Sequence, residues 1–213
     1  MATYIIVAII AYVIGSINFS VIISKKFAGF DLREKGSGNA GSTNVLRTVG
    51  KRAALLTLIC DVLKGVIAVL IATLIGAIIK SVDKALLVQI AGILVIIGHT
   101  FPILFEFKGG KGVATSLGVL LTINWKIGLI CLIFALVIMA ATRIVSIGSI
   151  GAAILCPILV LFFTTNFIVP TKGIKYFVFS IILAAIVIFN HRTNIKRIIA
   201  GTENKLSFKN TKA

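Results

Sequence analysis

Long apolar runs, separated by short polar stretches rich in glycine and basic residues, make up most of this 213-residue chain. A membrane-spanning helix needs about 20 apolar residues, and several of the runs reach that length. The pattern predicts an all-α, polytopic integral membrane protein with seven transmembrane helices, at residues 3–24, 53–79, 85–97, 112–123, 127–142, 144–163 and 174–189. The segment 112–123 is short for a crossing, because its residues span only roughly 18 Å of helix.

Composition and charge sharpen this expectation. Hydrophobic residues make up 59% of the chain and the mean hydropathy is +1.13, which is too apolar for an ordinary soluble domain. The 22 Lys and Arg residues exceed the 6 Asp and Glu residues, so the net charge is +16. Basic residues prefer the cytoplasmic side of short loops, and their distribution predicts an N-terminus outside and a C-terminus inside. Only Lys80, Lys84, Lys126, Lys172 and Lys175 would then lie outside or at the outer edge.

The chain is expected to form one membrane-embedded domain, residues 1–203, followed by a short basic cytoplasmic tail, residues 204–213. The basic surface favours anionic lipid headgroups and phosphorylated substrates as partners. Nucleic acid is excluded, because no RNA- or DNA-binding module is present and aromatic residues do not alternate with the basic clusters. Cys60, Cys131 and Cys156 stand singly in apolar segments. They are expected to be packing residues, without a disulfide or a bound metal.

The first polar stretch, residues 36–47, combines small residues, hydroxyls and amides with an arginine at its end. Such a loop can surround an anion with backbone N–H groups, hydroxyls and a bidentate guanidinium. A turn followed by an N-capped interfacial helix is equally compatible with these residues, and a helix N-terminus itself favours phosphate. The candidate residues here are Ser37, Gly38, Asn39, Thr43, Asn44 and Arg47.

A second polar stretch contains three glycines and two lysines, at residues 108–112. Glycine exposes backbone N–H groups and lysine adds positive charge, so Lys108, Gly109, Gly110 and Lys111 are candidates for an anion cradle. The alternative is a flexible loop whose lysines only set topology. Upstream, Pro102 is expected to end the third segment.

Three ionisable residues lie within or beside apolar segments. Asp61 and Lys64 are three residues apart, which puts them on one helix face, and a structural ion pair is the favoured role for them. His99 is a candidate general base or a hydrogen-bonding residue at a helix end. The second role is favoured, because the sequence offers His99 no visible carboxylate partner.

The remaining polar residues lie at the ends of the last three segments. Arg143, Ser146 and Ser149 have i, i+3, i+6 spacing, so a helix would align them along one face. Arg143 is equally suited to anchoring a helix at the membrane edge. His191 and Asn194 would share a face at the end of the last helix, where basic residues also complement the helix dipole. Under the predicted topology all four polar regions fall on the same membrane face.

At these positions the sequence resembles the bacterial acyl-phosphate-dependent glycerol-3-phosphate acyltransferase family (PlsY), nearly from end to end. The matching motifs are Gly36-Ser37-Gly38-Asn39 with Gly41, Thr43-Asn44 and Arg47; Asp61 with Lys64-Gly65; Gly98-His99 through Thr115; Arg143 with Ser146 and Ser149; and His191 through Asn194 with Gly201-Thr202-Glu203.

The resemblance implies a seven-helix enzyme of the bacterial cytoplasmic membrane, with its active site on the cytoplasmic side. It would transfer an acyl group from acyl phosphate to the sn-1 hydroxyl of glycerol 3-phosphate, with no metal or other cofactor. A separate peripheral enzyme would supply the acyl phosphate. The expected phosphate cradle consists of Ser37, Asn39, Thr43, Arg47, Lys108, Gly109, Gly110 and Lys111. Ser146, Ser149, His191 and Asn194 are expected to complete the pocket and orient the reacting carbonyl. Gly38, Asn44 and Arg143 are further expected substrate-binding residues.

Among these, the expected catalytic residues are Ser37, Arg47, Lys111, His191 and Asn194. The acceptor of the hydroxyl proton stays open. The resemblance favours the phosphate of the acyl phosphate itself, whereas the residues alone point to His191. A transporter of phosphorylated anions is the main alternative function, since the short segment 112–123 is also compatible with a half-helix. No inverted repeat supports it, and the polar residues gather at one face of the membrane.

Overall fold

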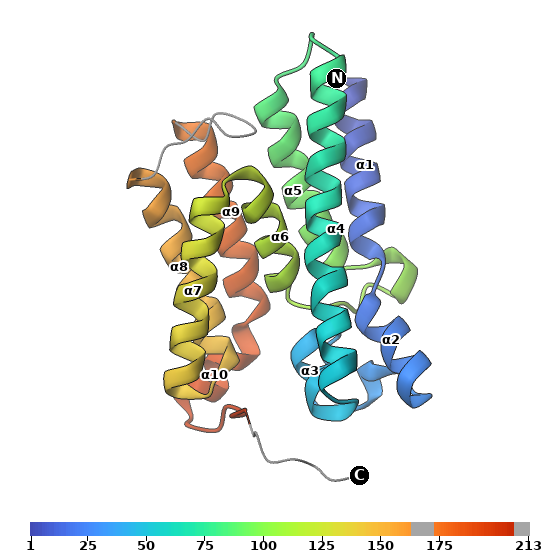
Figure 1. The fold of residues 1–213 in the computed structure, drawn as a ribbon, viewed down its shortest axis with the longest axis vertical. Helices are drawn as coiled ribbons and strands as arrows, with labels where there is room; N and C mark the ends of the chain where they lie inside the picture. Colours follow the sequence, from blue (N-terminus) through green and yellow to red (C-terminus); the bar gives the residue numbers. More distant parts are fainter. Residues whose placement is uncertain (163–172, 207–213) are drawn as a thin grey trace.

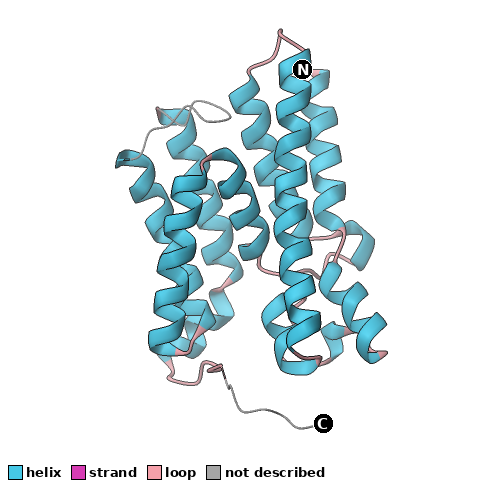
Figure 2. Cartoon of the chain, viewed as in Figure 1, coloured by secondary structure: helices cyan, strands magenta, loops and turns pink. Residues whose placement is uncertain are grey.

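The structure, a computed structural model, describes residues 1–162 and 173–206, and the regular elements in these parts are all helical (Figures 1 and 2). The end of the sixth predicted segment, Lys172 and residues 207–213 of the predicted tail lie outside them. The helices are α1 (Ala2–Ser16), α2 (Phe19–Ala28), η1 (Leu32–Glu34), α3 (Ser42–Thr48), α4 (Lys51–Ile78), α5 (Lys84–Thr100), η2 (Ile103–Phe105), α6 (Val113–Ile123), α7 (Trp125–Thr142), α8 (Val145–Phe162), α9 (Ile174–Asn190) and α10 (Arg192–Ile199).

Five helical stretches in the described parts are long and apolar enough to cross a membrane. They are Ala2–Ala28, Lys51–Ile78, Lys84–Phe105, Trp125–Thr142 and Val145–Phe162. The pair α9 and α10, bent by 61°, makes a sixth if it forms one broken span. The segment predicted at 112–123 is a helix, but α6 has only 11 residues and is shorter than a usual span. The chain therefore folds as an all-helical, multi-pass membrane protein.

The helices form two groups that meet along α4 and α6. One group contains α1 to α5, the other contains α6 to α10, and α6 packs along α4 (Figure 1). The N-terminus lies at one end of the molecule, whereas α3 and α10 lie at the opposite end (Figure 1). The polar loops before α3 and around α10 are thereby brought to the same end.

Glycines allow the close helix contacts that hold this arrangement. A Cβ atom on Gly118 of α6 would overlap the carbonyl of Val62 on α4, and one on Gly65 would overlap the carbonyl of Thr115. Small residues of this kind let helix backbones approach inside membranes, where van der Waals packing is a main attraction between helices. The glycine pair fixes the position of α6, and with it the position of the loop that precedes α6.

The first predicted segment is not one continuous helix, because the chain breaks at Ile17 and Asn18 between α1 and α2. The break frees carbonyl groups that need donors. Lys64 on α4 supplies them: its Nζ donates to the carbonyls of Gly15 (3.1 Å) and Ile17 (2.9 Å). The Asn18 side chain caps the start of α2.

The predicted ion pair between Asp61 and Lys64 is confirmed, with 2.9 Å between Oδ1 and Nζ. The expectation that His99 lacks a carboxylate partner is wrong. His99 Nδ1 on α5 lies 3.5 Å from Asp61 Oδ1 on α4. The two residues are far apart in sequence and meet only because α4 and α5 pack against each other. Pro102 follows α5, as expected.

Candidate functional site

Residues from separate parts of the chain meet around the carboxylate of Glu203, just after α10. Glu203 accepts hydrogen bonds from Ser146 Oγ on α8 (2.9 Å), and from Asn194 Nδ2 (2.6 Å) and Arg197 Nε (2.7 Å) on α10. Its side chain is only 5% exposed. Burial alone would raise the pKa of Glu203, but the three donors outweigh burial and lower the pKa. Glu203 is therefore a fixed anion that ties the start of α8 to α10.

Lys111 joins this cluster from the loop that precedes α6. Its ammonium group donates a hydrogen bond to Asn194 Oδ1, on the side chain that also donates to Glu203. Burial lowers the pKa of Lys111 to about 8, and Glu203 opposes this shift whereas Arg197 and Arg47 add to it. Lys111 is thus a largely buried cation that is still mostly protonated at neutral pH.

The loop 36–47 reaches the cluster through Arg47, in the last turn of α3. Arg47 donates to the carbonyl of Asn204 (3.3 Å), and partial burial lowers the pKa of its guanidinium. Asn44 fixes the shape of the loop, because its side chain accepts from the N–H of Ser37 (3.0 Å) and donates to the carbonyl of Lys35 (3.0 Å). The helix predicted after this loop exists as α3, but Gly41 precedes it without a side-chain cap. Of the other predicted residues, Ser37 and Gly38 are exposed, and Asn39 and Thr43 are half-buried.

The backbone of the glycine loop differs from the expectation. The N–H of Gly109 donates to the carbonyl of Thr100 (3.1 Å), and that of Gly110 donates to the carbonyl of His99 (3.1 Å). These two N–H groups satisfy the end of α5, so in this conformation they do not point at an anion as predicted. The glycines instead permit a close approach, because a Cβ on Gly110 would lie 2.5 Å from the carbonyl of Ala40. The loop 36–47 and the glycine loop are therefore in contact.

His191 lies at the break between α9 and α10, and Asn194 lies one turn further on; both are buried. The Nδ1 atom of His191 is 2.8 Å from the carbonyl of Val187. A neutral ring that donates from Nδ1 to this carbonyl leaves Nε2 as a proton acceptor. Asn190, just before the break, donates to the carbonyl of Lys111 (3.4 Å) and ties α9 to the glycine loop.

The predicted alignment of Arg143 with Ser146 and Ser149 is wrong. Arg143 ends α7 with φ 62°, and α8 begins only at Val145, so Arg143 is not on the helix that carries the serines. Its carbonyl accepts from the N–H of Leu206 (2.7 Å), which holds the chain after Glu203. The two serines also diverge in role. Ser146 donates to Glu203, while Ser149 donates to the carbonyl of Val145 (3.0 Å).

An apolar cavity adjoins this cluster between α6, α7, α8 and α9. Ser149 lines it near the polar residues, together with Val187, whose carbonyl contacts His191. Its other walls include Val113, Leu117, Leu120, Cys131, Leu132, Cys156 and Leu183. The arrangement places a cavity suited to a hydrocarbon chain beside a group of cations.

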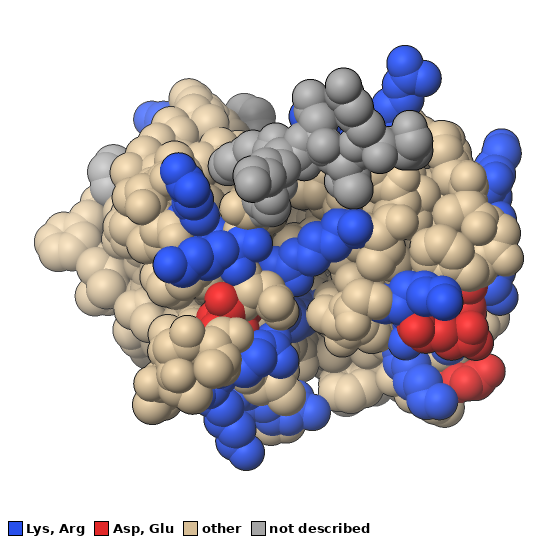
Figure 3. Space-filling view, turned by 90° about the horizontal axis from the view of Figure 1, so that it is seen from below, with Lys and Arg blue, Asp and Glu red and all other residues tan. Residues whose placement is uncertain are grey.

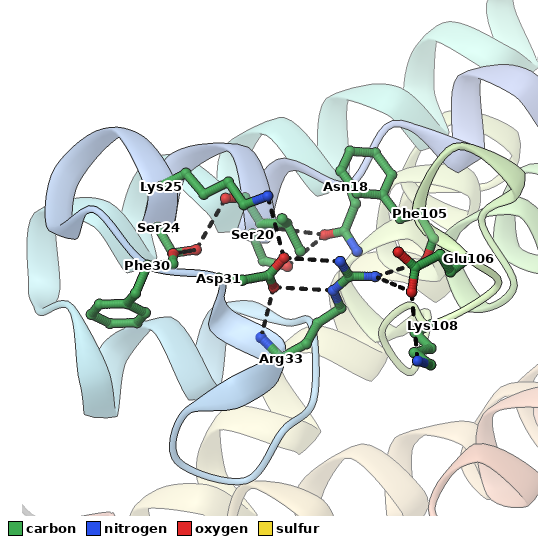
Figure 4. Close-up of polar contacts among 11 residues, drawn as sticks. Asn18, Ser20, Ser24, Lys25, Phe30, Asp31, Arg33, Phe105, Glu106 and Lys108 are labelled. Atoms are coloured by element: carbon green, nitrogen blue, oxygen red, sulfur yellow. Dashed lines mark hydrogen bonds and ion pairs between the residues drawn. The ribbon is translucent and has the colours of Figure 1, made fainter.

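Lys108 belongs to a different group of charges. Its ammonium lies 3.5 Å from Glu106, and its side chain is 70% exposed. Arg33 joins the same group: it makes a bidentate contact with Asp31 and donates to the carbonyl of Phe105 (2.9 Å). Figure 4 shows Arg33 between Asp31 and the turn at Glu106, with Lys108 beyond Glu106. This group clamps the turn that leads into the glycine loop.

The end of the molecule that carries α3 and α10 is strongly basic, with Lys and Arg side chains gathered around small acidic patches (Figure 3). Sequence reasoning did not assign a site role to Glu203 or Arg197. A signal for Glu203 was available, since the chain has only 6 acidic residues and this one follows a basic helix. Arg197 gave no such signal, because nothing in the sequence separates it from the basic residues around it.

The chain is similar in sequence to known acyltransferases. A family model described as glycerol-3-phosphate acyltransferase matches residues 5–201. The glycerol-3-phosphate acyltransferase of Clostridioides difficile (strain 630) is 46% identical over 207 residues, 97% of each chain. That of Thermoanaerobacter sp. (strain X514) is 46% identical over 202 residues, 95% of each chain.

Solved structures extend the match to three dimensions. The crystal structure of PlsY, an integral membrane glycerol 3-phosphate acyltransferase, in its glycerol 3-phosphate form has a TM-score of 0.83 and 33% identity over 96% of each chain. Its lysophosphatidic acid form gives a TM-score of 0.81 and 31% identity. Sequence and fold agree over almost the whole length, and the chain belongs to the glycerol-3-phosphate acyltransferase family.

Proposed function

We propose that this protein transfers an acyl group from acyl phosphate to the sn-1 hydroxyl of glycerol 3-phosphate, giving 1-acylglycerol 3-phosphate (lysophosphatidic acid) and phosphate in bacterial phospholipid biosynthesis. One observation carries the proposal. Lys111, Arg47 and Arg197 converge around Glu203 and Asn194 at the basic end of the molecule, directly beside an apolar cavity. The relatives named as glycerol-3-phosphate acyltransferases supply the acceptor class.

The charges suit a reaction between two phosphate-bearing substrates. Acyl phosphate is a mixed anhydride with phosphate as its leaving group, so no covalent protein nucleophile is required. The acceptor hydroxyl attacks the carbonyl carbon, a new C–O bond forms, and the bond to the phosphate oxygen breaks. Phosphate leaves with the electron pair of that bond. Cations must hold the two anions together during this step, and proximity of this kind contributes up to about 7–11 kcal/mol.

Each predicted residue has a specific task in the proposal. Arg47, Lys111 and the loop of Ser37, Gly38, Asn39 and Thr43 bind phosphate groups, while Asn44 holds that loop in shape. Gly109 and Gly110 permit the close contact between the two loops. Asn194 donates toward the substrates through its second amide N–H, and Ser146 donates to Glu203, the carboxylate that fixes the Asn194 amide. The acyl chain occupies the apolar cavity from Ser149 inward. Lys108, exposed beside Glu106, and Arg143, at the end of α7, contribute to substrate binding from the edge of the site.

The hydroxyl proton has two candidate acceptors, the phosphate of the acyl phosphate and His191 Nε2, and the two make different predictions. If the phosphate of the acyl phosphate takes the hydroxyl proton, His191→Gln leaves the pH profile of turnover unchanged. If His191 Nε2 is the base, the same substitution removes the acid limb of that profile. The pairing of Nδ1 with the Val187 carbonyl favours a neutral ring with Nε2 open, so His191 remains a candidate base. Steady-state rates from pH 5 to pH 9 separate the two cases.

The proposal includes an orientation in the bacterial cytoplasmic membrane. Seven crossings, with α6 as a short one, put the N-terminus outside and the basic end at the cytoplasm. There the site meets glycerol 3-phosphate from the cytosol and the apolar cavity receives an acyl chain from the inner leaflet. A separate peripheral enzyme supplies the acyl phosphate, and the reaction uses no metal or bound cofactor.

An assay of the purified protein in detergent tests the proposal. With acyl phosphate and glycerol 3-phosphate, we expect 1-acylglycerol 3-phosphate and free phosphate; acyl-CoA and acyl carrier protein thioesters should give no product. Product from acyl-CoA alone would defeat the assigned donor. Transport of phosphorylated anions into vesicles without any acylation would favour the transporter.

A further inference from the structure

Asp61, Lys64 and His99 form a buried group of ionisable residues outside the Glu203 cluster, and they take no part in the proposed chemistry. Asp61 and Lys64 on α4 are each 2% exposed, and His99 at the end of α5 is 5% exposed. Ionisable groups within an apolar bundle are costly, and proteins keep them there when they serve a function or are paired. The pairing of Asp61 with Lys64 accounts for two of the three. His99 needs a further explanation.

The carboxylate of the Asp61–Lys64 ion pair faces the imidazole of His99. Lys64 Nζ lies 2.9 Å from Asp61 Oδ1 and is also held by two backbone carbonyls at the α1–α2 break. The same carboxylate oxygen faces His99 Nδ1 at 3.5 Å. Both atoms are buried, and their separation is an ion-pair distance, longer than an ordinary hydrogen bond, so the contact between them is electrostatic. Asp61 therefore has a fixed position, set by Lys64, from which it orients the ring.

The opposite edge of the ring supports the glycine loop. A Cβ on Gly110 would overlap His99 Nε2, so the ring and Gly110 are in direct contact. The backbone of His99 adds a second restraint, because its carbonyl accepts from the N–H of Gly110 (3.1 Å). The carbonyl of Ala40, in the loop 36–47, lies on the same glycine. Gly110 therefore lies between His99 and the loop 36–47.

We propose that His99, oriented by the Asp61–Lys64 pair, is a positioning residue that sets the spacing between the loop 36–47 and Lys111. This inference rests on the proposed function, because it assigns His99 a task in holding one substrate phosphate between the two loops. The ring acts as a spacer under Gly110, the residue that precedes Lys111. If the spacer is lost, Lys111 and Arg47 no longer approach a common anion, and binding weakens.

The KM for glycerol 3-phosphate tests this role better than total activity does. His99→Phe keeps a ring but removes both nitrogens, and we expect it to raise KM by about tenfold, because a shift of about 1 Å in a positioning group can cost up to 10²-fold. His99→Gln, which retains an amide near the position of Nε2, should recover part of the loss. A residue that only stabilises the fold would lower the amount of active protein and leave the KM of the folded fraction unchanged.

Removal of the Asp61–Lys64 ion pair provides a second test of the positioning role. The double variant Asp61→Asn, Lys64→Met leaves no unpaired buried charge, and we expect its KM to rise in the same direction. Combined with His99→Phe, it should raise KM no further, because both changes act through the same ring. The matched control is Gln89→Leu, another buried polar residue of α5 that lines a separate apolar groove, and its KM should equal that of the wild type.

The outcomes distinguish a failure of the positioning role of His99 from a failure of the proposed acyl transfer. Wild-type KM in folded His99→Phe and His99→Gln protein, or effects that multiply in the combined variant, overturn the positioning role alone. A wild-type protein that acylates no glycerol 3-phosphate overturns the proposed function and this inference with it. A rise in KM with partial recovery in His99→Gln supports both.

Discussion

At the scale of single residues, Lys111 is the proposed phosphate-binding group whose role is simplest to test. It is largely buried, a side-chain amide holds its ammonium group, and burial lowers its pKa to about 8. Lys111→Ala should lower kcat/KM on the order of 10²–10³-fold, the usual loss when a donor to a developing charge is removed. Lys196→Ala, at an exposed position of α10, is the matched control and should stay near wild type. Equal losses in the two variants would refute a specific role for Lys111.

The same residue predicts how activity depends on pH. In the proposed function the protonated ammonium binds phosphate, and its population falls as the pH rises through about 8. Activity should therefore decline on the alkaline side with a midpoint near that value. Lys111→Arg keeps its charge at high pH, because a guanidinium is effectively always protonated, so its alkaline decline should disappear below pH 9. A profile with an unchanged alkaline limb in this variant would assign the titration to another group.

At the scale of helices and loops, Arg33 connects the segment after α2 to the turn at Glu106, through its contacts with Asp31 and the Phe105 carbonyl. These contacts form the Arg33 clamp. Glu106 and Phe107 both have φ 57°, an uncommon conformation for residues other than glycine, so the turn needs outside support. Arg33→Ala removes the bond to the Phe105 carbonyl and should lower kcat/KM roughly three- to tenfold, since a small loop displacement misplaces Lys111. Lys25→Ala, which removes only an exposed outer contact to Asp31, should cost little. Steady-state kinetics of the two variants would contradict the clamp if the losses were equal.

The contact between α4 and α6 makes a prediction about stability. A Cβ on Gly118 would meet the backbone carbonyl of Val62, which cannot rotate away, so Gly118→Ala should cost about 1–3 kcal/mol of overpacking. Gly151→Ala is the matched control, because its new Cβ would approach the ring of Phe134 at 2.9 Å and the ring can shift. Thermal unfolding in detergent measures both. A larger loss in Gly151→Ala than in Gly118→Ala would show that α6 tolerates displacement from α4.

The sequence predicted elements better than contacts between them. Runs of apolar residues located α4 to α9 to within a few residues, because membrane helices depend mainly on local composition. The break after Ser16 was missed, since Lys64 stabilises it from another helix. The partner of His99 was missed for the same reason, because Asp61 is distant in sequence. Arg143 was misplaced because a left-handed residue ended α7 where the spacing alone allowed one continuous face.

At the scale of the whole molecule, the proposed orientation predicts which loops meet each side of the membrane. Lys80 lies in the α4–α5 turn near the end that carries the N-terminus, and Arg52 lies at the start of α4, near the end that carries α3. In a variant with Cys60, Cys131 and Cys156 replaced by Ala, Lys80→Cys should react with a membrane-impermeant maleimide in intact cells. Arg52→Cys should react only after lysis. The reverse pattern would invert the topology and move the site to the outer face.

The fold brings the loop 36–47, the glycine loop and the residues around Glu203 together, and an apolar cavity adjoins them. In the proposed function this arrangement couples phosphate release to acylation of the acceptor. The direct measurement is the stoichiometry of phosphate release and lipid product by the purified protein, with acyl phosphate in the presence and absence of glycerol 3-phosphate. The predicted result is equal amounts of phosphate and 1-acylglycerol 3-phosphate, with little release when the acceptor is omitted. Release that does not depend on glycerol 3-phosphate, or a product formed only from acyl-CoA, would contradict acyl transfer from acyl phosphate at this site.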